Sequence, residues 1–193
     1  SLGDHDAPYG RAYVYAIDPA AKTIQLVVDV NKTLGLTDRQ LYGPGKIHAP
    51  LIDGGDGWLY FVTYRGWKSG PSFKGDFLLR YNMESGKAEN LGVMAPDMSV
   101  PSLIFHPGSR MFYGLAVPAN GKEEPLPAFY AYSLEEKKVV FSQPSKSKVS
   151  RSCFFDATGR GYWDSEGSLA RFDPKTREIA ITKGKIPGNG ALR

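Results

Sequence analysis

The chain has 193 residues and a formal net charge of +4, with 41% hydrophobic and 23% charged residues. This composition is too apolar for a disordered chain, and the dispersed positive charge does not favour nucleic-acid binding. No apolar run is long enough to span a membrane, and the single cysteine, Cys153, excludes an internal disulfide or a cysteine-rich zinc site. Abundant glycine and proline, with 12% aromatic residues, favour short strands joined by tight turns.

A hairpin pattern recurs four times along the chain. Each copy is an apolar and aromatic strand that ends in a small polar residue, followed by a polar turn and a second strand. The small polar residues are Asp18, Asn82, Ser133 and Asp173. Such a residue suits the first position of a turn, because its side chain accepts hydrogen bonds from the backbone ahead of it.

A second pattern precedes three of these hairpins. Residues 48–61, 100–113 and 150–163 each read as a short apolar strand, a glycine-containing turn and an aromatic strand. The two patterns together make a unit of four antiparallel strands, a to d, that repeats about every fifty residues. Four short strands per repeat, with glycine and aromatic residues at fixed places, are typical of a β-propeller blade.

The repeats resemble β-propeller proteins of the YVTN, NHL and virginiamycin-lyase kind. Residues 56–61 (Asp-Gly-Trp-Leu-Tyr-Phe) and 79–87 (Leu-Arg-Tyr-Asn-Met-Glu-Ser-Gly-Lys) carry the resemblance best. It implies an all-β fold of four-stranded antiparallel propeller blades. A β-sandwich is the alternative, because it also has evenly spaced strands.

We expect one propeller domain over residues 1–193 that forms an incomplete ring. The predicted blades cover residues 1–30 (partial), 45–93, 97–143 and 148–183, and residues 189–193 begin another strand. Propellers close with 4–8 blades, and about three and a half blades leave the ring open. The chain is therefore expected to be a fragment, or to be completed by a second copy or by further blades. A closed four-blade ring remains the alternative.

The connections between strands b and c, and between strand d and the next strand a, are long in most repeats. In a meander they emerge on one face, and long loops on a rigid scaffold are where binding residues concentrate. We expect ligand-binding residues there. The candidates are Arg65, Trp67, Lys68, Tyr42, Lys46 and Arg151. For the aromatic and basic segment 64–74, the alternative is a loop anchored by its own aromatic side chains.

Two histidines belong to the same face. His48 begins an innermost strand, and His5 lies between Asp4 and Asp6 in a connection. One interpretation makes His48 and His5 catalytic acid–base groups, with Asp4, His5 and Asp6 as metal ligands. The alternative is that residues 4–6 form a solvated turn and that His48 is a hydrogen-bonded strand end. His106 lies at the opposite turns, where a structural role is favoured.

We expect a propeller scaffold or binding module for a small molecule, a carbohydrate or a protein, using the long-loop face. The alternative is a lyase or hydrolase: resemblance to virginiamycin-type and oligogalacturonate lyases would imply a divalent metal and histidine acid–base chemistry. No cofactor motif is evident, and the sequence leaves open whether the protein is an enzyme. Its low cysteine content and the resemblance to bacterial secreted propellers favour export.

Overall fold

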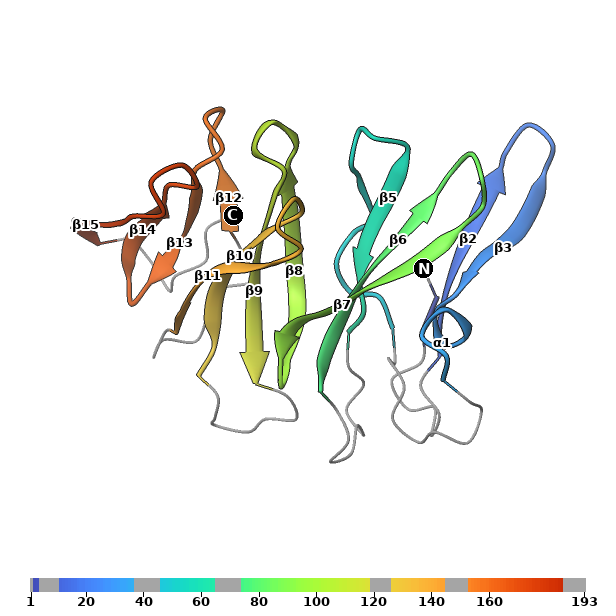
Figure 1. The fold of residues 1–193 in the computed structure, drawn as a ribbon, viewed down its shortest axis with the longest axis horizontal. Coiled ribbons are helices and arrows are strands. Elements are labelled where there is room, and N and C mark those ends of the chain that lie inside the picture. The colour runs from blue at the N-terminus through green and yellow to red at the C-terminus, as the bar shows by residue number, and fades with distance from the viewer. Residues whose placement is uncertain are drawn as a thin grey trace. The chain divides into compact units, whose positions relative to one another are not determined.

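The computed structural model describes residues 2–3, 11–36, 46–64, 74–118, 126–144 and 153–185. Strands dominate these residues, as Figure 1 shows. A one-turn helix, α1 (Val30–Thr33), and a 3-10 turn, η1 (Pro107–Ser109), are the helical elements among them. The predicted all-β fold is confirmed, and no helix within these ranges is long and apolar enough to cross a membrane.

The strands form four antiparallel sheets in which neighbours along the chain are neighbours in the sheet. The first sheet has three strands, β1 (Leu2–Gly3), β2 (Ala12–Asp18) and β3 (Thr23–Asp29). The second has four, β4 (Ile52–Asp53), β5 (Trp58–Val62), β6 (Gly75–Asn82) and β7 (Ala88–Pro96). The third contains β8 (Met98–His106), β9 (Met111–Pro118), β10 (Ala128–Ser133) and β11 (Lys138–Pro144). The fourth contains β12 (Cys153–Phe155), β13 (Gly161–Ser165), β14 (Ser168–Phe172) and β15 (Ile179–Lys185).

The chain divides into two compact units, Ser1–Asp97 and Met98–Arg193, each holding two of these sheets. In the first unit, Ala12, Val14 and Val28 of the β1–β3 sheet pack with Phe61 and Leu79 of the β4–β7 sheet. The contact joins one face of each sheet, because alternate residues of a strand point to opposite faces.

The second unit repeats this arrangement with larger side chains. Phe129 of β10 stacks on Trp163 of β13, with ring centroids 4.0 Å apart. Tyr113 of β9 and Phe172 of β14 belong to the same buried cluster. The Tyr113 hydroxyl donates a hydrogen bond to the Gly159 carbonyl. The face-to-face contact of consecutive sheets is the packing that the propeller resemblance implies.

The hairpin turns are built as the sequence predicts. The side chains of Asp18, Asn82 and Asp173 accept backbone N–H bonds from Ala20 at 2.9 Å, Ser85 at 2.7 Å and Lys175 at 3.0 Å. The Ser133 hydroxyl accepts one from Glu136 at 3.1 Å. Four residues after each polar residue the backbone turns left-handed, with φ of 53°, 69°, 53° and 60°. These left-handed residues are Lys22, Gly86, Lys137 and Arg177.

Connections at the other end of the strands vary in length. Figure 1 shows the β2–β3 and β6–β7 turns at one end of their strands, while β5 ends and β6 begins at the other end. Two connections at that end are short: Asp97 alone joins β7 to β8, and Glu166 with Gly167 joins β13 to β14. The expected long connections are therefore absent at these two places.

Candidate functional site

The site begins where the chain enters the β4–β7 sheet. Lys46 and Tyr64 form an isolated antiparallel bridge. The Lys46 amide donates to the Tyr64 carbonyl at 3.1 Å, and the Tyr64 amide donates to the Lys46 carbonyl at 2.6 Å. These two bonds hold Lys46 beside Tyr64, which lies two residues after the end of β5. The segment that leads into β4 and the segment that leaves β5 therefore lie side by side.

Three half-buried side chains meet at this bridge. The Lys46 Nζ atom lies 5.2 Å from the centroid of the Tyr64 ring, and the His48 ring centroid lies 4.8 Å from it, at an interplanar angle of 39°. Ile47 and Ala49 are buried, which is the alternation expected of extended chain and places Lys46 and His48 on the same side. We call Lys46, His48 and Tyr64 the His48–Tyr64 cluster.

A buried polar pair adjoins the cluster along the chain. Thr63 is fully buried; its hydroxyl donates to the Asp76 carboxylate at 3.2 Å and accepts from the Phe77 amide at 2.9 Å. Asp76 is only 1% exposed. A buried carboxylate is costly unless it is hydrogen bonded, so the pair ties the end of β5 to the start of β6. Sequence reasoning missed Asp76, although an acidic residue directly before the apolar run 77–79 was a signal for it.

The structure brings together two of the residues predicted from the sequence, Lys46 and His48. The other candidates lie outside the described residues: Asp4, His5, Asp6, Tyr42, Arg65, Trp67, Lys68 and Arg151. Across the described part of the chain, no group of three or more His, Cys, Asp or Glu side chains is placed to hold a metal ion.

The third histidine has a structural contact. His106 caps η1: its Nδ1 atom accepts a hydrogen bond from the Ser109 amide at 3.1 Å and lies 2.9 Å from the Ser109 hydroxyl. Its ring packs edge-to-face with Phe155, and the two ring centroids lie 5.1 Å apart. Burial raises the pKa of Cys153 to about 12, which disfavours the reactive thiolate form.

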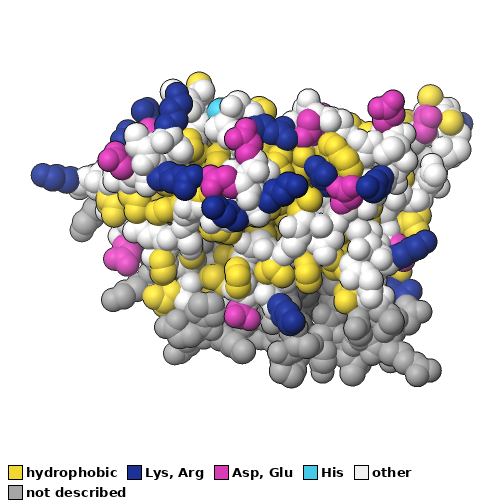
Figure 2. Space-filling view, viewed as in Figure 1, with side chains coloured by type: hydrophobic (Ala, Val, Ile, Leu, Met, Phe, Trp, Pro, Cys, Tyr) yellow, Lys and Arg dark blue, Asp and Glu magenta, His cyan; other side chains and the backbone are white. Residues whose placement is uncertain are grey.

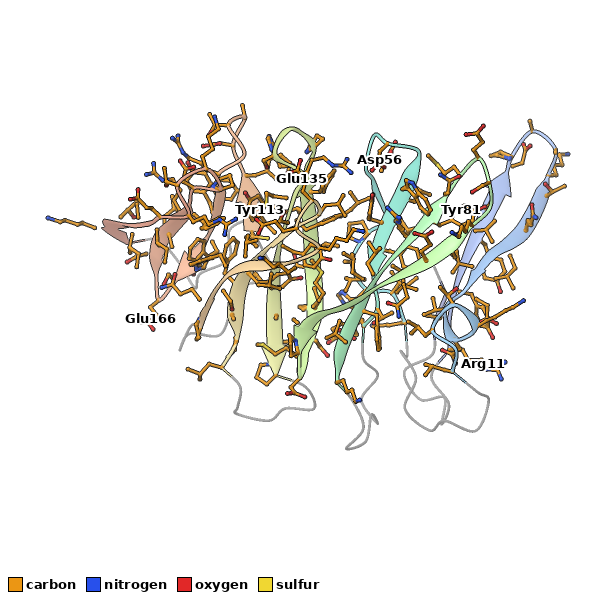
Figure 3. All side chains as sticks on the ribbon, viewed as in Figure 1. Arg11, Asp56, Tyr81, Tyr113, Glu135 and Glu166 are labelled. Carbon is orange, nitrogen blue, oxygen red and sulfur yellow. The ribbon has the colours of Figure 1, made fainter. Side chains whose placement is uncertain are left out.

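At the opposite end of the β4–β7 sheet, charged side chains have partners on the same sheet. Figure 3 places Asp56 in the β4–β5 turn, where its carboxylate accepts from the Tyr60 hydroxyl at 2.9 Å. Arg80 stacks 4.0 Å over Trp58 and donates from Nε to Glu89 at 2.8 Å. Figure 2 shows Lys and Arg side chains interleaved with Asp and Glu side chains on the face that it draws. Paired charges of this kind favour a structural role for that end of the sheet.

Comparison with known proteins identifies the fold. No family model matches the chain, and no curated protein does. Among solved structures, the extracellular domain of BT4673 from B. thetaiotaomicron matches 99% of the chain with a TM-score of 0.57 and 16% identity. Dipeptidyl peptidase 4 from Porphyromonas gingivalis matches 89% with a TM-score of 0.56 and 12% identity. An oligogalacturonate lyase in complex with manganese matches 85% with a TM-score of 0.47 and 13% identity.

These likenesses concern the fold alone, because the identities are low. The chain spans 22%, 30% and 40% of the three matched chains, respectively. With the four sheet meanders described above, the two matches with TM-scores above 0.5 establish the fold: the protein is built from β-propeller blades. The β-sandwich alternative is thereby set aside. One fold of this kind hosts many unrelated functions, so the class alone does not define an activity.

Proposed function

We propose that the protein is a propeller-type binding module whose ligand contacts the His48–Tyr64 cluster. One observation carries the proposal: an ammonium, an imidazole and a phenol ring converge, half-buried, on a hydrogen-bonded backbone bridge. Binding sites combine a preformed surface with a few polar groups that fix the orientation of the ligand.

The chemistry of the cluster favours an anionic ligand that also carries a ring or a flat apolar face. The Tyr64 ring offers such a face, and Lys46 supplies a positive charge beside it. The His48 imidazole, which contacts the Tyr64 ring, adds a hydrogen-bonding group. Acidic carbohydrates have both features, since a carboxylate or sulfate group sits on a ring with an apolar side. We therefore propose acidic carbohydrates as the ligand class.

The backbone around the cluster is suited to holding it in place. Ile47 and Ala49 anchor the entry segment in the core, and Thr63 is hydrogen bonded to the start of β6. A site held this way loses little conformational entropy when a ligand binds, which favours affinity.

The test is a glycan array that contains neutral and acidic oligosaccharides, followed by calorimetric titration of the best acidic binder. Replacing Lys46 by Gln should weaken that binding about tenfold, which corresponds to about 1.4 kcal/mol for a lost charge-assisted contact. The matched control is Lys22→Gln in the exposed β2–β3 turn, which should leave the affinity unchanged. Equal affinities for Lys46→Gln and Lys22→Gln, or no acidic binder on the array, would refute the proposal.

Assays of cleavage and of metal content on the same purified protein distinguish the binding module from the lyase or hydrolase alternative. If the bound acidic oligosaccharide is cleaved, if the purified protein holds a stoichiometric divalent metal, and if His48→Ala abolishes cleavage, the lyase or hydrolase interpretation replaces the binding module. Binding without cleavage or metal supports the module. The predicted catalytic role of His5, and the predicted metal-binding roles of Asp4, His5 and Asp6, would apply only if the protein cleaves the oligosaccharide and holds a metal.

A further inference from the structure

Two aromatic rings and an arginine form a row across one face of the β12–β15 sheet. The register pairs Phe154 with Tyr162 and Tyr162 with Arg171, and residues that lie directly opposite each other share a face. Trp163 and Ala170 alternate with them along the strands, so they point to the other face, where they are buried in the core. We call Phe154, Tyr162 and Arg171 the Phe154–Arg171 row.

The aromatic part of the row is held in place and is partly open to solvent. The Phe154 and Tyr162 rings are nearly parallel, with centroids 4.9 Å apart and an interplanar angle of 4°. The Tyr162 hydroxyl donates to the Asp156 carboxylate at 2.8 Å, which fixes the Tyr162 ring. Phe154 is 42% exposed, so its ring offers an apolar surface to a ligand.

The arginine of the row has a hydrogen-bond donor without an acceptor. The Nε atom of Arg171 is buried and has no hydrogen-bond partner among the described residues. Arg80, Arg160 and Arg177, in contrast, each pair with a carboxylate. A buried donor without a partner is unfavourable, and a bound acceptor would remove that cost. The row therefore calls for an acceptor beside its aromatic rings.

The described carboxylates closest to the row along the sheet are engaged by other donors. Asp164 lies diagonally across from Arg171 on the same face, is 7% exposed and accepts from the Gly167 amide at 2.7 Å. Asp156 is bound to the Tyr162 hydroxyl. Arg171 forms an ion pair with neither of these two described residues. Burial and the hydrogen bond to Asp156 raise the pKa of Tyr162, and the Arg171 charge opposes this shift, so the guanidinium lies near the phenol.

We propose that the Phe154–Arg171 row is a binding site for a small aromatic carboxylate. The ring of the ligand packs on the exposed part of the aromatic pair, and its carboxylate accepts a charge-assisted hydrogen bond from the guanidinium. Neighbouring strands lie about 4.8 Å apart, so a ring and its own carboxyl group can contact Tyr162 and Arg171 together. A simple anion would leave the rings uncovered, and a neutral aromatic molecule would leave the Nε donor unpaired. The row shares no residue with the His48–Tyr64 cluster, so this inference does not rest on the proposed function.

Titration of the whole chain with benzoate, followed by heteronuclear NMR of the arginine Nε–H groups, tests the proposal. We expect benzoate to shift the Arg171 signal. Acetate and benzyl alcohol each offer one half of the recognition, so both should bind at least about tenfold more weakly than benzoate. The Arg177 signal is the internal control, because Arg177 is paired with Glu136; it should not move.

Matched variants separate this site from other places where benzoate could bind. Arg171→Gln and Phe154→Leu should each weaken benzoate binding at least about fivefold, with unchanged circular dichroism spectra. Arg177→Gln and Lys46→Gln should leave the affinity unchanged. An Arg171 signal that benzoate does not move, acetate that binds as tightly as benzoate, full affinity in Arg171→Gln, or a loss in Lys46→Gln would overturn the proposal. The first two of these results are measured on the wild type, so they apply even if a variant fails to fold.

Discussion

Asp156 offers the sharpest test of how the blades are stabilised. Its carboxylate, in the β12–β13 turn, accepts four hydrogen bonds: from the amide and hydroxyl of Thr158 at 2.9 and 2.6 Å, from the Arg160 amide at 3.2 Å and from the Tyr162 hydroxyl at 2.8 Å. The Thr158 hydroxyl contributes most to holding the pKa of Asp156 well below its usual value, followed by the Tyr162 hydroxyl. The ionised form is therefore the one that stabilises the turn.

We consider the substitution Asp156→Asn, which keeps an oxygen acceptor but removes the charge. Hydrogen bonds to a charged group are worth about 1.5–3 kcal/mol each when buried, and the partial exposure of this site reduces that figure. We expect the variant to lose about 1–2 kcal/mol of unfolding free energy at pH 7. Asp156→Ala, which removes all four acceptor contacts, should lose about 2–4 kcal/mol.

The loss should depend on pH with a definite sign. A carboxylate whose pKa is lowered by folding stabilises the folded state above its unfolded pKa of about 3.9, and this stabilisation disappears as the pH falls through the folded value. The difference between the wild type and Asp156→Asn should therefore be full at pH 7 and shrink steadily below about pH 4.

Urea unfolding followed by tryptophan fluorescence measures this difference, because Trp163 lies in the same sheet. Asp53→Asn is the control: the Asp53 carboxylate accepts a bond from Gly55 at 2.8 Å in the exposed β4–β5 turn. It should change stability by less than about 0.5 kcal/mol. An Asp156→Asn loss that is the same at pH 3 and pH 7, or no larger than that of Asp53→Asn, would refute the reasoning.

Three further outcomes are expected. Lys137→Gly should raise the unfolding free energy by about 0.5–1 kcal/mol and Gly86→Ala should lower it by about 1 kcal/mol, because both residues occupy left-handed turn positions; thermal melts that shift in the same direction would contradict this. Phe129→Ala should cost about 3–5 kcal/mol in urea unfolding, since the ring is fully buried on Trp163; a cost below about 1 kcal/mol would show that this stack is dispensable. Cys153 should react with iodoacetamide at pH 8 far more slowly in the native protein than in urea, because its pKa is raised to about 12; equal rates would contradict the packing described.

Features fixed by local chemistry could be predicted from the sequence. The turn roles of Asp18 and Asn82 follow from side chains that bond to the backbone within three residues. Lys46 and His48 were both expected on the long-loop face, and the structure brings them together beside Tyr64. The turn prediction needed only neighbouring residues.

Features fixed by strand register could not be predicted in this way. Ile52 pairs with Tyr60, a register that would set His48 opposite Tyr64. The bridge instead pairs Tyr64 with Lys46, two residues away. Pro50, in the intervening segment, has no amide hydrogen and cannot continue the ladder. The burial of Asp76 was missed for a related reason: before the fold is known, an acidic residue next to a strand resembles a solvated turn.

The bridge between Lys46 and Tyr64 uses main-chain atoms only. Any residue except proline can therefore make the same two backbone hydrogen bonds at these positions. Mutations at either position can exchange one recognition group for another while the strand entry stays where it is. Under the proposed function, ligand preference at the His48–Tyr64 cluster can therefore change through single substitutions that leave these two backbone hydrogen bonds in place.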